Sequence, residues 1–283
     1  MDSERLKYQF RNFSIGSLLN LFLLLVAASC LFPLFWTFST SLKTQSQVFS
    51  DMSLIPKAFH WENYYLAWTE GSFGVYFLNS VLYTICTVIG IVLVSSLAAY
   101  AFSRLKFPGR NLFFFMFLAA MMIPLPGSFV PLYIVMKKLH LLNTPQGYVL
   151  CMINVGLSLS IFLLKTFFDK MPTDLEDAAR IDGCSKLGIW WNVALPLARP
   201  ALAVIVIFNS LTVWNEYILA LIIFDDTRFM PLQVGLSTFH GEFVTQYPLL
   251  MAGIIITVIP ILLIYILLQK HIVKGLTAGA VVG

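Results

Sequence analysis

The chain of 283 residues is too hydrophobic for a water-soluble protein. Apolar residues make up 59% of it and charged residues only 11%, whereas soluble domains carry about 25% charged residues. The same composition excludes an intrinsically disordered chain, and a net charge of +4, spread along the sequence, is too weak for nucleic-acid binding. We therefore predict an integral membrane protein.

Six apolar segments are predicted to cross the membrane as helices, since a bilayer core requires about 20 apolar residues per helix. In chain order these are 17–39, 75–102, a segment between Arg110 and Lys137, 148–168, a segment between Arg199 and Asp225, and a segment that begins near Pro248. The first is longer than the apolar core of a cleavable signal peptide. The sequence thus predicts an all-α polytopic membrane protein.

The lysine and arginine residues predict that both termini are cytoplasmic, because cytoplasmic loops carry an excess of these residues. With the N-terminus inside, 13 of the 18 lysine and arginine residues fall on the cytoplasmic side. The five on the outer side are Lys43, Lys57, Lys137, Lys138 and Arg228.

The cytoplasmic segment 169–200, between the fourth and fifth predicted spans, has the pattern of an organised arm. Thr173 and Glu176 fit a capping box, in which each side chain bonds a free backbone N–H at a helix start. This predicts a helix that begins at Asp174 and ends at Gly183, because glycine readily adopts the left-handed conformation that terminates helices.

Ser185 is placed to cap a second helix that ends at Leu195, where Pro196 intervenes. One reading makes the arm an interfacial helix anchored by Trp190 and Trp191. The other makes it a docking element that sits in a groove of another protein. Small side chains would allow close approach, and flanking charges would fix the register; these are Ala178, Ala179, Asp177 and Arg180. The residues alone favour neither reading.

The amino-acid sequence of this loop resembles a known signature. D-A-A-x3-G-x9-V-x-L-P, residues 177–196, is similar to E-A-A-x3-G-x9-I-x-L-P of the permease subunits of binding-protein-dependent ABC importers, with Asp177 in place of Glu and Val193 in place of Ile. Four further segments resemble the carbohydrate-uptake branch of that family: L-E-D-A-A-R-I-D-G-C-S around the signature, W-N-E-Y at 214–217, R-L-K-F-P-G-R at 104–110 and K-G-L-T-A-G-A from Lys274.

The resemblance implies the type I ABC importer transmembrane fold, similar to the maltose-type second permease subunit. Residues 1–74 would form a tail, the first span and an outer loop, residues 75–270 the permease core with its coupling loop at 169–200, and residues 271–283 a cytoplasmic tail. The implied function is that of a transmembrane subunit of an ATP-driven sugar importer, for an oligosaccharide or sugar derivative, in the plasma or inner membrane of a prokaryote.

The implied partners are a second, non-identical permease subunit, two copies of a cytoplasmic ATPase, an extracellular or periplasmic solute-binding protein, and membrane lipid. By the same resemblance, the loop docks on the ATPase as a coupling helix. The residues implied in this coupling are Glu176, Asp177, Ala178, Ala179, Asp182, Gly183, Leu195 and Pro196.

ATP hydrolysis is not expected on this chain. Gly183 and Gly188 have the glycine spacing of a phosphate-binding loop, but Ile189 stands where that loop requires lysine. No nucleophile–base pair can be recognised among the scattered histidines either. We therefore expect ATP and Mg²⁺ on the partner ATPase, and no cofactor, metal or catalytic residue on this chain, which is not an enzyme by itself.

A polar segment in the fifth predicted span is a candidate part of the translocation path. Its residues are Asn209, Ser210, Thr212, Trp214, Asn215 and Glu216, and we expect the helix to be broken around 209–215. An ionisable residue such as Glu216 costs about 2.5–3.5 kcal/mol at a helix centre in the membrane, so it should face the protein interior. It either offers acceptors to sugar hydroxyls or a gate, or ties the helix to a neighbouring one.

Two alternative functions are an ion-coupled secondary transporter and an ABC importer permease for a solute other than sugar. Secondary transporters often show internal repeats with broken helices in matching halves, and we find no such repeat here. The sequence does not identify the sugar.

Overall fold

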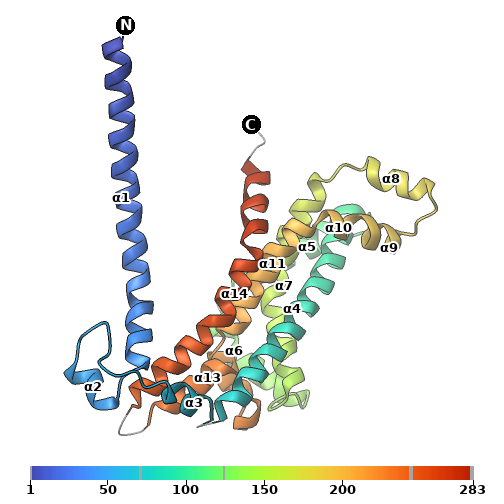
Figure 1. Ribbon diagram of the computed structural model, residues 1–283. Coiled ribbons are helices and arrows are strands. Elements are labelled where there is room, and N and C mark those ends of the chain that lie inside the picture. The colour runs from blue at the N-terminus through green and yellow to red at the C-terminus, as the bar shows by residue number, and fades with distance from the viewer. Residues whose placement is uncertain (1, 70–71, 124, 242–244, 281–283) are drawn as a thin grey trace. The chain divides into compact units, whose positions relative to one another are not determined.

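The computed structural model describes residues 2–69, 72–123, 125–241 and 245–280, and most of them lie in helices (Figure 1). The chain divides into two compact units. Unit 1 comprises Met1–Gly71 and Phe239–Ile256, and unit 2 comprises Ser72–Thr238 and Thr257–Gly283. The long last helix, α14 (Tyr247–Ala280), contributes to both units.

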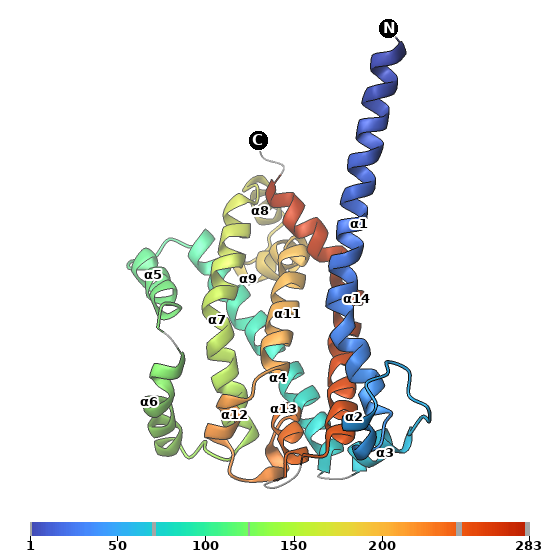
Figure 2. The ribbon, with the colours of Figure 1, turned by 90° about the vertical axis from the view of Figure 1, so that its left-hand side faces the viewer.

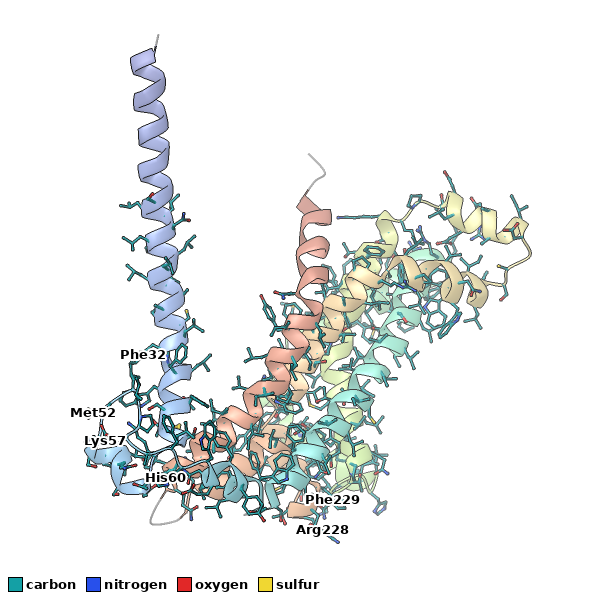
Figure 3. The ribbon with its side chains drawn as sticks, in the orientation of Figure 1. Phe32, Met52, Lys57, His60, Arg228 and Phe229 are labelled. Carbon is teal, nitrogen blue, oxygen red and sulfur yellow. The ribbon has the colours of Figure 1, made fainter. Side chains whose placement is uncertain are left out.

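Unit 1 contains the long helix α1 (Asp2–Ser41) and two short helices, α2 (Gln45–Ser50) and α3 (Glu62–Thr69). The ammonium group of Lys43, whose residue is only 2% exposed, organises the connecting segment. It donates hydrogen bonds of 2.7 Å to the carbonyl oxygens of Asp51 and Ser53, which satisfies a buried charge without a carboxylate. Met52, Lys57 and His60 mark this segment in Figure 3.

Three long helices form the centre of unit 2: α4 (Phe73–Arg104), α7 (Pro145–Lys170) and α11 (Arg199–Trp214). They run side by side in both ribbon views (Figures 1 and 2). Small residues allow their backbones to approach closely, as expected where helices pack in a membrane. At Gly156 on α7, an added β-carbon would collide with Ile91 of α4 and Asn209 of α11.

Shorter helices surround these three. They are α5 (Arg110–Ala120), α6 (Leu125–Lys138), α8 (Asp174–Ile181), α9 (Lys186–Ile189), α10 (Leu195–Leu197), α12 (Ile218–Ile223) and α13 (Leu232–Gly235), with a π-helical segment η2 (Trp190–Ala194) and 3₁₀ turns η3 (Thr227–Phe229) and η4 (Leu236–Phe239). Helices α12 and α13 lie at one end of unit 2, near the labelled Arg228 and Phe229 of Figure 3, and α8 and α9 lie at the other.

Two apolar clusters stabilise unit 2, one toward each end. The cluster near α12 contains the rings of Tyr83, Tyr148 and Phe224, whose centroids are 5.0 to 5.9 Å apart. The other cluster joins α4 and α7 to the segment that carries α8, α9 and η2. The second cluster therefore fixes the base of the predicted arm.

Among the described residues, four helical stretches are long and apolar enough to cross a membrane: Gly16–Ser41, Phe73–Arg104, Pro145–Lys170 and Tyr247–Leu267. These confirm the first, second, fourth and sixth predicted spans as helices. The third predicted span is divided into α5 and α6, of 11 and 14 residues. The fifth is divided into α11 and α12. Helix α11 also follows the helical segment Lys186–Leu197, and the chain bends by 78° between these two segments.

The break in the fifth predicted span occurs at Asn215, the last residue of the predicted range. Helix α11 runs without interruption to Trp214, and the chain leaves the helix only at Asn215. The polar residues do not break it because their side chains bond within the helix. The Asn209 amide donates to the carbonyl oxygen of Ile205, and the Thr212 hydroxyl donates to that of Phe208.

Candidate functional site

The predicted arm is present as two helices joined by a glycine turn. Helix α8 ends at Ile181, and Gly183 adopts φ +82°, the left-handed conformation expected after a helix. The Ser185 hydroxyl then accepts a hydrogen bond of 3.2 Å from the N–H of Gly188 and so caps α9. Beyond α9 the backbone continues through η2 into α10, two residues past the predicted end at Leu195.

The predicted capping box at Thr173 is wrong. Thr173 has helical backbone angles, φ −69° and ψ −27°, and its side chain makes no capping hydrogen bond. A capping side chain requires an extended backbone at that position to reach the next free N–H groups. Glu176, the other half of the box, points elsewhere: its Oε1 lies 2.7 Å from Nε of Arg104, the last residue of α4.

Helix α8 presents two different faces. Glu176 and Ala179 are 2% and 9% exposed and face the core of unit 2. Asp177, Ala178 and Asp182 are exposed, and Ile181 is 87% exposed. The adjacent alanines of the signature therefore point in different directions, and only Ala178 is available to a partner. Of the two remaining residues implied in coupling, Leu195 is half-buried and Pro196 is exposed.

The two tryptophans of the arm also separate. Trp190 is buried in the cluster at the arm's base, whereas Trp191 is 59% exposed. Leu187 on α9 is 67% exposed and Leu175 on α8 is 44% exposed. We call Leu175, Ala178, Ile181, Leu187 and Trp191 the outer apolar residues of the arm. Such a group of exposed apolar side chains is typical of a surface that binds a partner or a membrane.

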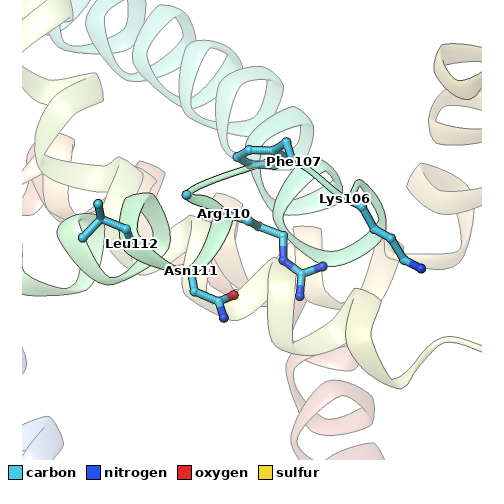
Figure 4. Close-up of a pocket in the computed structure, with 6 residues that line it drawn as sticks. Lys106, Phe107, Arg110, Asn111 and Leu112 are labelled. Atoms are coloured by element: carbon cyan, nitrogen blue, oxygen red, sulfur yellow. The ribbon is translucent and has the colours of Figure 1, made fainter.

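An open pocket of about 440 Å³ lies beside the turn between α4 and α5. Figure 4 shows the side chains of Lys106 and Arg110 on the same side of this turn. The two cationic side chains make the pocket suitable for anions. None of its lining residues has a carboxylate side chain that could bind a metal ion. Across the described residues, no group of three or more His, Cys, Asp or Glu side chains is placed to bind a metal ion.

The candidate path residues fall into a buried set and an exposed set. Asn209 is buried, and its amide donates a hydrogen bond of 3.1 Å to the Ser160 hydroxyl of α7. Ser210 is buried, and the buried Trp214 donates from its indole N–H to the carbonyl oxygen of Thr257. Thr212 and Asn215, in contrast, are exposed.

Glu216 caps a helix. Its Oε1 accepts a hydrogen bond of 2.6 Å from the N–H of Leu219, in the first turn of α12. Asn215 accepts one from the Gln233 side chain. The link from α11 to a neighbouring helix, which the sequence offered as one role of these two residues, is made by Asn215 to Gln233 of α13, and Asn209 adds a second link to α7.

Sequence reasoning missed Arg104 as a site residue. It belongs to the R-L-K-F-P-G-R segment quoted for the resemblance, but no local pattern pairs it with Glu176, 72 positions later. Only the packing of α4 against the arm brings the two charges together.

The structure is thus that of a membrane protein, a bundle of apolar helices that carries an organised helical arm beside its end. The family model for the inner membrane component of binding-protein-dependent transport systems matches residues 90–278, and the chain belongs to this family. It is therefore a multi-pass permease of the bacterial cell membrane. Family membership also decides against the ion-coupled secondary transporter.

The relatives that the chain resembles cover nearly its whole length. It is 32% identical to a probable ABC transporter permease protein of Bacillus subtilis, over 100% of this chain and 92% of the relative. It is 33% identical to a diacetylchitobiose uptake system permease protein of Streptomyces coelicolor, over 91% and 86%. Among solved structures, a chain of a bacterial ABC transporter involved in alginate import matches with a TM-score of 0.82 and 26% identity, over 93% of this chain and 98% of that one.

Proposed function

We propose that this permease forms half of the translocation path of an ATP-driven importer for an oligosaccharide or sugar derivative. Support comes from relatives whose names specify diacetylchitobiose and alginate, both saccharides built of several sugar units. A second, non-identical permease would supply the other half, and an extracellular or periplasmic binding protein would deliver the sugar.

The proposed topology has six spans and cytoplasmic termini. The four long apolar helices account for four spans, and the pairs α5–α6 and α11–α12 would provide the other two. Broken spans are tolerated in a membrane where the interrupted backbone is buried in protein or lines a cavity. The arm then lies in the cytoplasm, in agreement with the lysine and arginine distribution.

The proposal that α8 couples this chain to the ATPase rests on the exposed outer face of that helix. Its inner face is held in the core through Glu176 and Ala179, while Ala178 and Ile181 project outward. A helix fixed on one side and apolar on the other can dock into a cleft of the ATPase and pass its movement to the membrane helices. ATP and Mg²⁺ are bound by the ATPase in this proposal.

Purification tests the proposed partnership. Expressed with its genomic neighbours, the chain should copurify with a second permease and two copies of an ATPase, and ATP hydrolysis should require the ATPase. The reconstituted complex, given its binding protein, should import labelled oligosaccharide only when ATP is present. Hydrolysis by the isolated chain, or uptake without ATP, would refute the proposal.

Replacing Ala178 with tryptophan should weaken ATPase binding without harming the fold, because Ala178 is exposed in this chain. Overfilling a packed contact costs about 1–3 kcal/mol, which corresponds to a loss of affinity of roughly five- to hundredfold. The measurement is ATPase retention during purification, at equal permease levels. Ala58→Trp, the same change at an exposed alanine far along the chain from the arm, is the control and should retain the ATPase.

Thiol labelling tests the proposed path. Cysteines at Thr212 and Asn215 should react with a small water-soluble reagent, and the extent should change when ATP is trapped on the complex. Cysteines at Asn209 and Ser210 should be protected, since both positions are buried within this chain. Protection of Thr212 and Asn215 in every nucleotide state would remove this segment from the path.

A further inference from the structure

Arg104 occupies an unusual position at the end of α4. Its guanidinium is largely buried, with the side chain 11% exposed, and it holds two groups of the arm at once. Nε forms an ion pair of 2.7 Å with Oε1 of Glu176, and Nη2 donates a hydrogen bond of 2.6 Å to the carbonyl oxygen of Met171. One side chain thus contacts both the start of the arm and the inner face of α8.

The partner carboxylate is buried still more completely. The Glu176 side chain is 2% exposed, and its second oxygen lies 3.5 Å from the Tyr100 hydroxyl and 3.8 Å from Nη2 of Arg180. Arg180 in turn pairs with Asp177 at 2.8 Å. Removal of one member of a buried ion pair leaves the other charge uncompensated, so the Arg104–Glu176 pair strongly disfavours separation of α8 from α4.

A second contact fixes the other side of the same junction. The Ser103 hydroxyl donates a hydrogen bond of 2.7 Å to Oδ1 of Asp169, near the end of α7. Oδ2 of Asp169 pairs with Lys165 at 2.6 Å. Two successive residues of α4 therefore hold the start of the arm and its helix α8.

We propose that Arg104 is a positioning residue that makes α8 and α4 move as one body, so that displacement of the arm by the ATPase reaches a membrane helix directly. This inference rests on the proposed coupling function. The extended guanidinium suits the task because it places charge beside the Glu176 carboxylate while Nη2 donates to the Met171 carbonyl, which the single ammonium of a lysine on a flexible chain does less well.

Spin-label distances test the one-body movement directly. Labels would be attached to cysteines at Leu97 on α4 and Asp174 on α8, both exposed, in the full complex with its native cysteines replaced by alanine. We expect one narrow distance distribution that is the same in nucleotide-free and ATP-trapped states. Arg104→Met should broaden it, whereas Lys106→Met, a change at an exposed cation two residues away, should not.

Three results would overturn the proposal: a broad distribution in the wild type, a distance that changes with nucleotide, or an Arg104→Met distribution as narrow as the wild type. If Arg104→Met does not reach the membrane, Arg104→Lys takes its place. The lysine variant should also broaden the distribution, and a distribution as narrow as the wild type would again contradict the inference.

The amount of sugar imported per ATP hydrolysed is a measurement that a purely structural role of Arg104 would leave unchanged. Arg104→Met and Glu176→Gln complexes, matched for membrane level, should retain the ATPase and hydrolyse ATP. Sugar imported per ATP should fall by roughly 5- to 150-fold, the usual range for coupling between two sites. Unchanged uptake per ATP would refute the role of Arg104. Failure of the wild-type chain to bind an ATPase would instead refute the proposed function, and the two failures are therefore distinguishable.

Discussion

Replacement of Gly183 with valine will remove most of the uptake activity while membrane levels stay near normal. Gly183 has φ +82°, and no atom lies within 4 Å of the place where a β-carbon would be added. The penalty is therefore one of backbone conformation and not of collision. A left-handed conformation costs an L-residue about 1–2 kcal/mol, and more for a β-branched one.

The turn will relieve this strain by changing its angles, which re-aims α9 relative to α8. A cost of 1–2 kcal/mol corresponds to a loss of uptake of roughly 5- to 30-fold, measured in vesicles at matched protein levels. Gly183→Asn is the control, because asparagine visits the left-handed region more readily and should keep most of the activity. Normal uptake by the valine variant would show that the geometry of this turn is unimportant.

Replacement of Gly156 with leucine will lower the stability of the helix bundle in unit 2. A β-carbon at Gly156 would collide with Oδ1 of Asn209 and Cδ1 of Ile91, so these side chains, or the helices that carry them, must shift to accommodate a leucine. Overpacking costs about 1–3 kcal/mol, and the displacement would also disturb the hydrogen bond from Asn209 to Ser160.

We expect Gly156→Leu to lower the amount of permease in the membrane and its half-life in detergent, and Gly156→Ala to have a smaller effect in the same direction. Gly16→Leu serves as the matched control, since no atom lies within 4 Å of that β-carbon position on α1. A Gly156→Leu protein as abundant and long-lived as the control would mean that the three helices are packed more loosely than described.

The arm shows which kinds of feature sequence reasoning predicts well. The glycine turn and the Ser185 cap depend on single residues with strong local preferences, and both were correctly placed. The prediction of a cap at Thr173 is wrong because the backbone of this residue is helical, a conformation that the neighbouring residues in the sequence do not determine. The signature identified the family, but it did not show that Ala178 faces outward and Ala179 inward.

Long-range polar contacts explain the remaining misses. The break was predicted around 209–215, yet Asn209 itself stays within the helix, because its amide is satisfied by Ile205 and by Ser160, 49 residues earlier. The sequence left open whether Glu216 offers acceptors to the path or links two helices, and its observed contact, the cap of α12, is neither. Hydropathy locates apolar segments, but it does not indicate which partner a polar side chain will find once the helices have packed.

The different orientations of the two neighbouring alanines bear on how this transporter and its proposed ATPase change together over evolutionary time. In the proposed docking, a larger residue at Ala178 could be accommodated by a smaller one in the ATPase cleft, so this position can vary in concert with the ATPase gene. A larger residue at Ala179, which is 9% exposed and packed in the same cluster as Ile189 and Trp190, must be compensated within this chain. Exchange of ATPases between related importers should therefore be limited by position 178 and be insensitive to position 179.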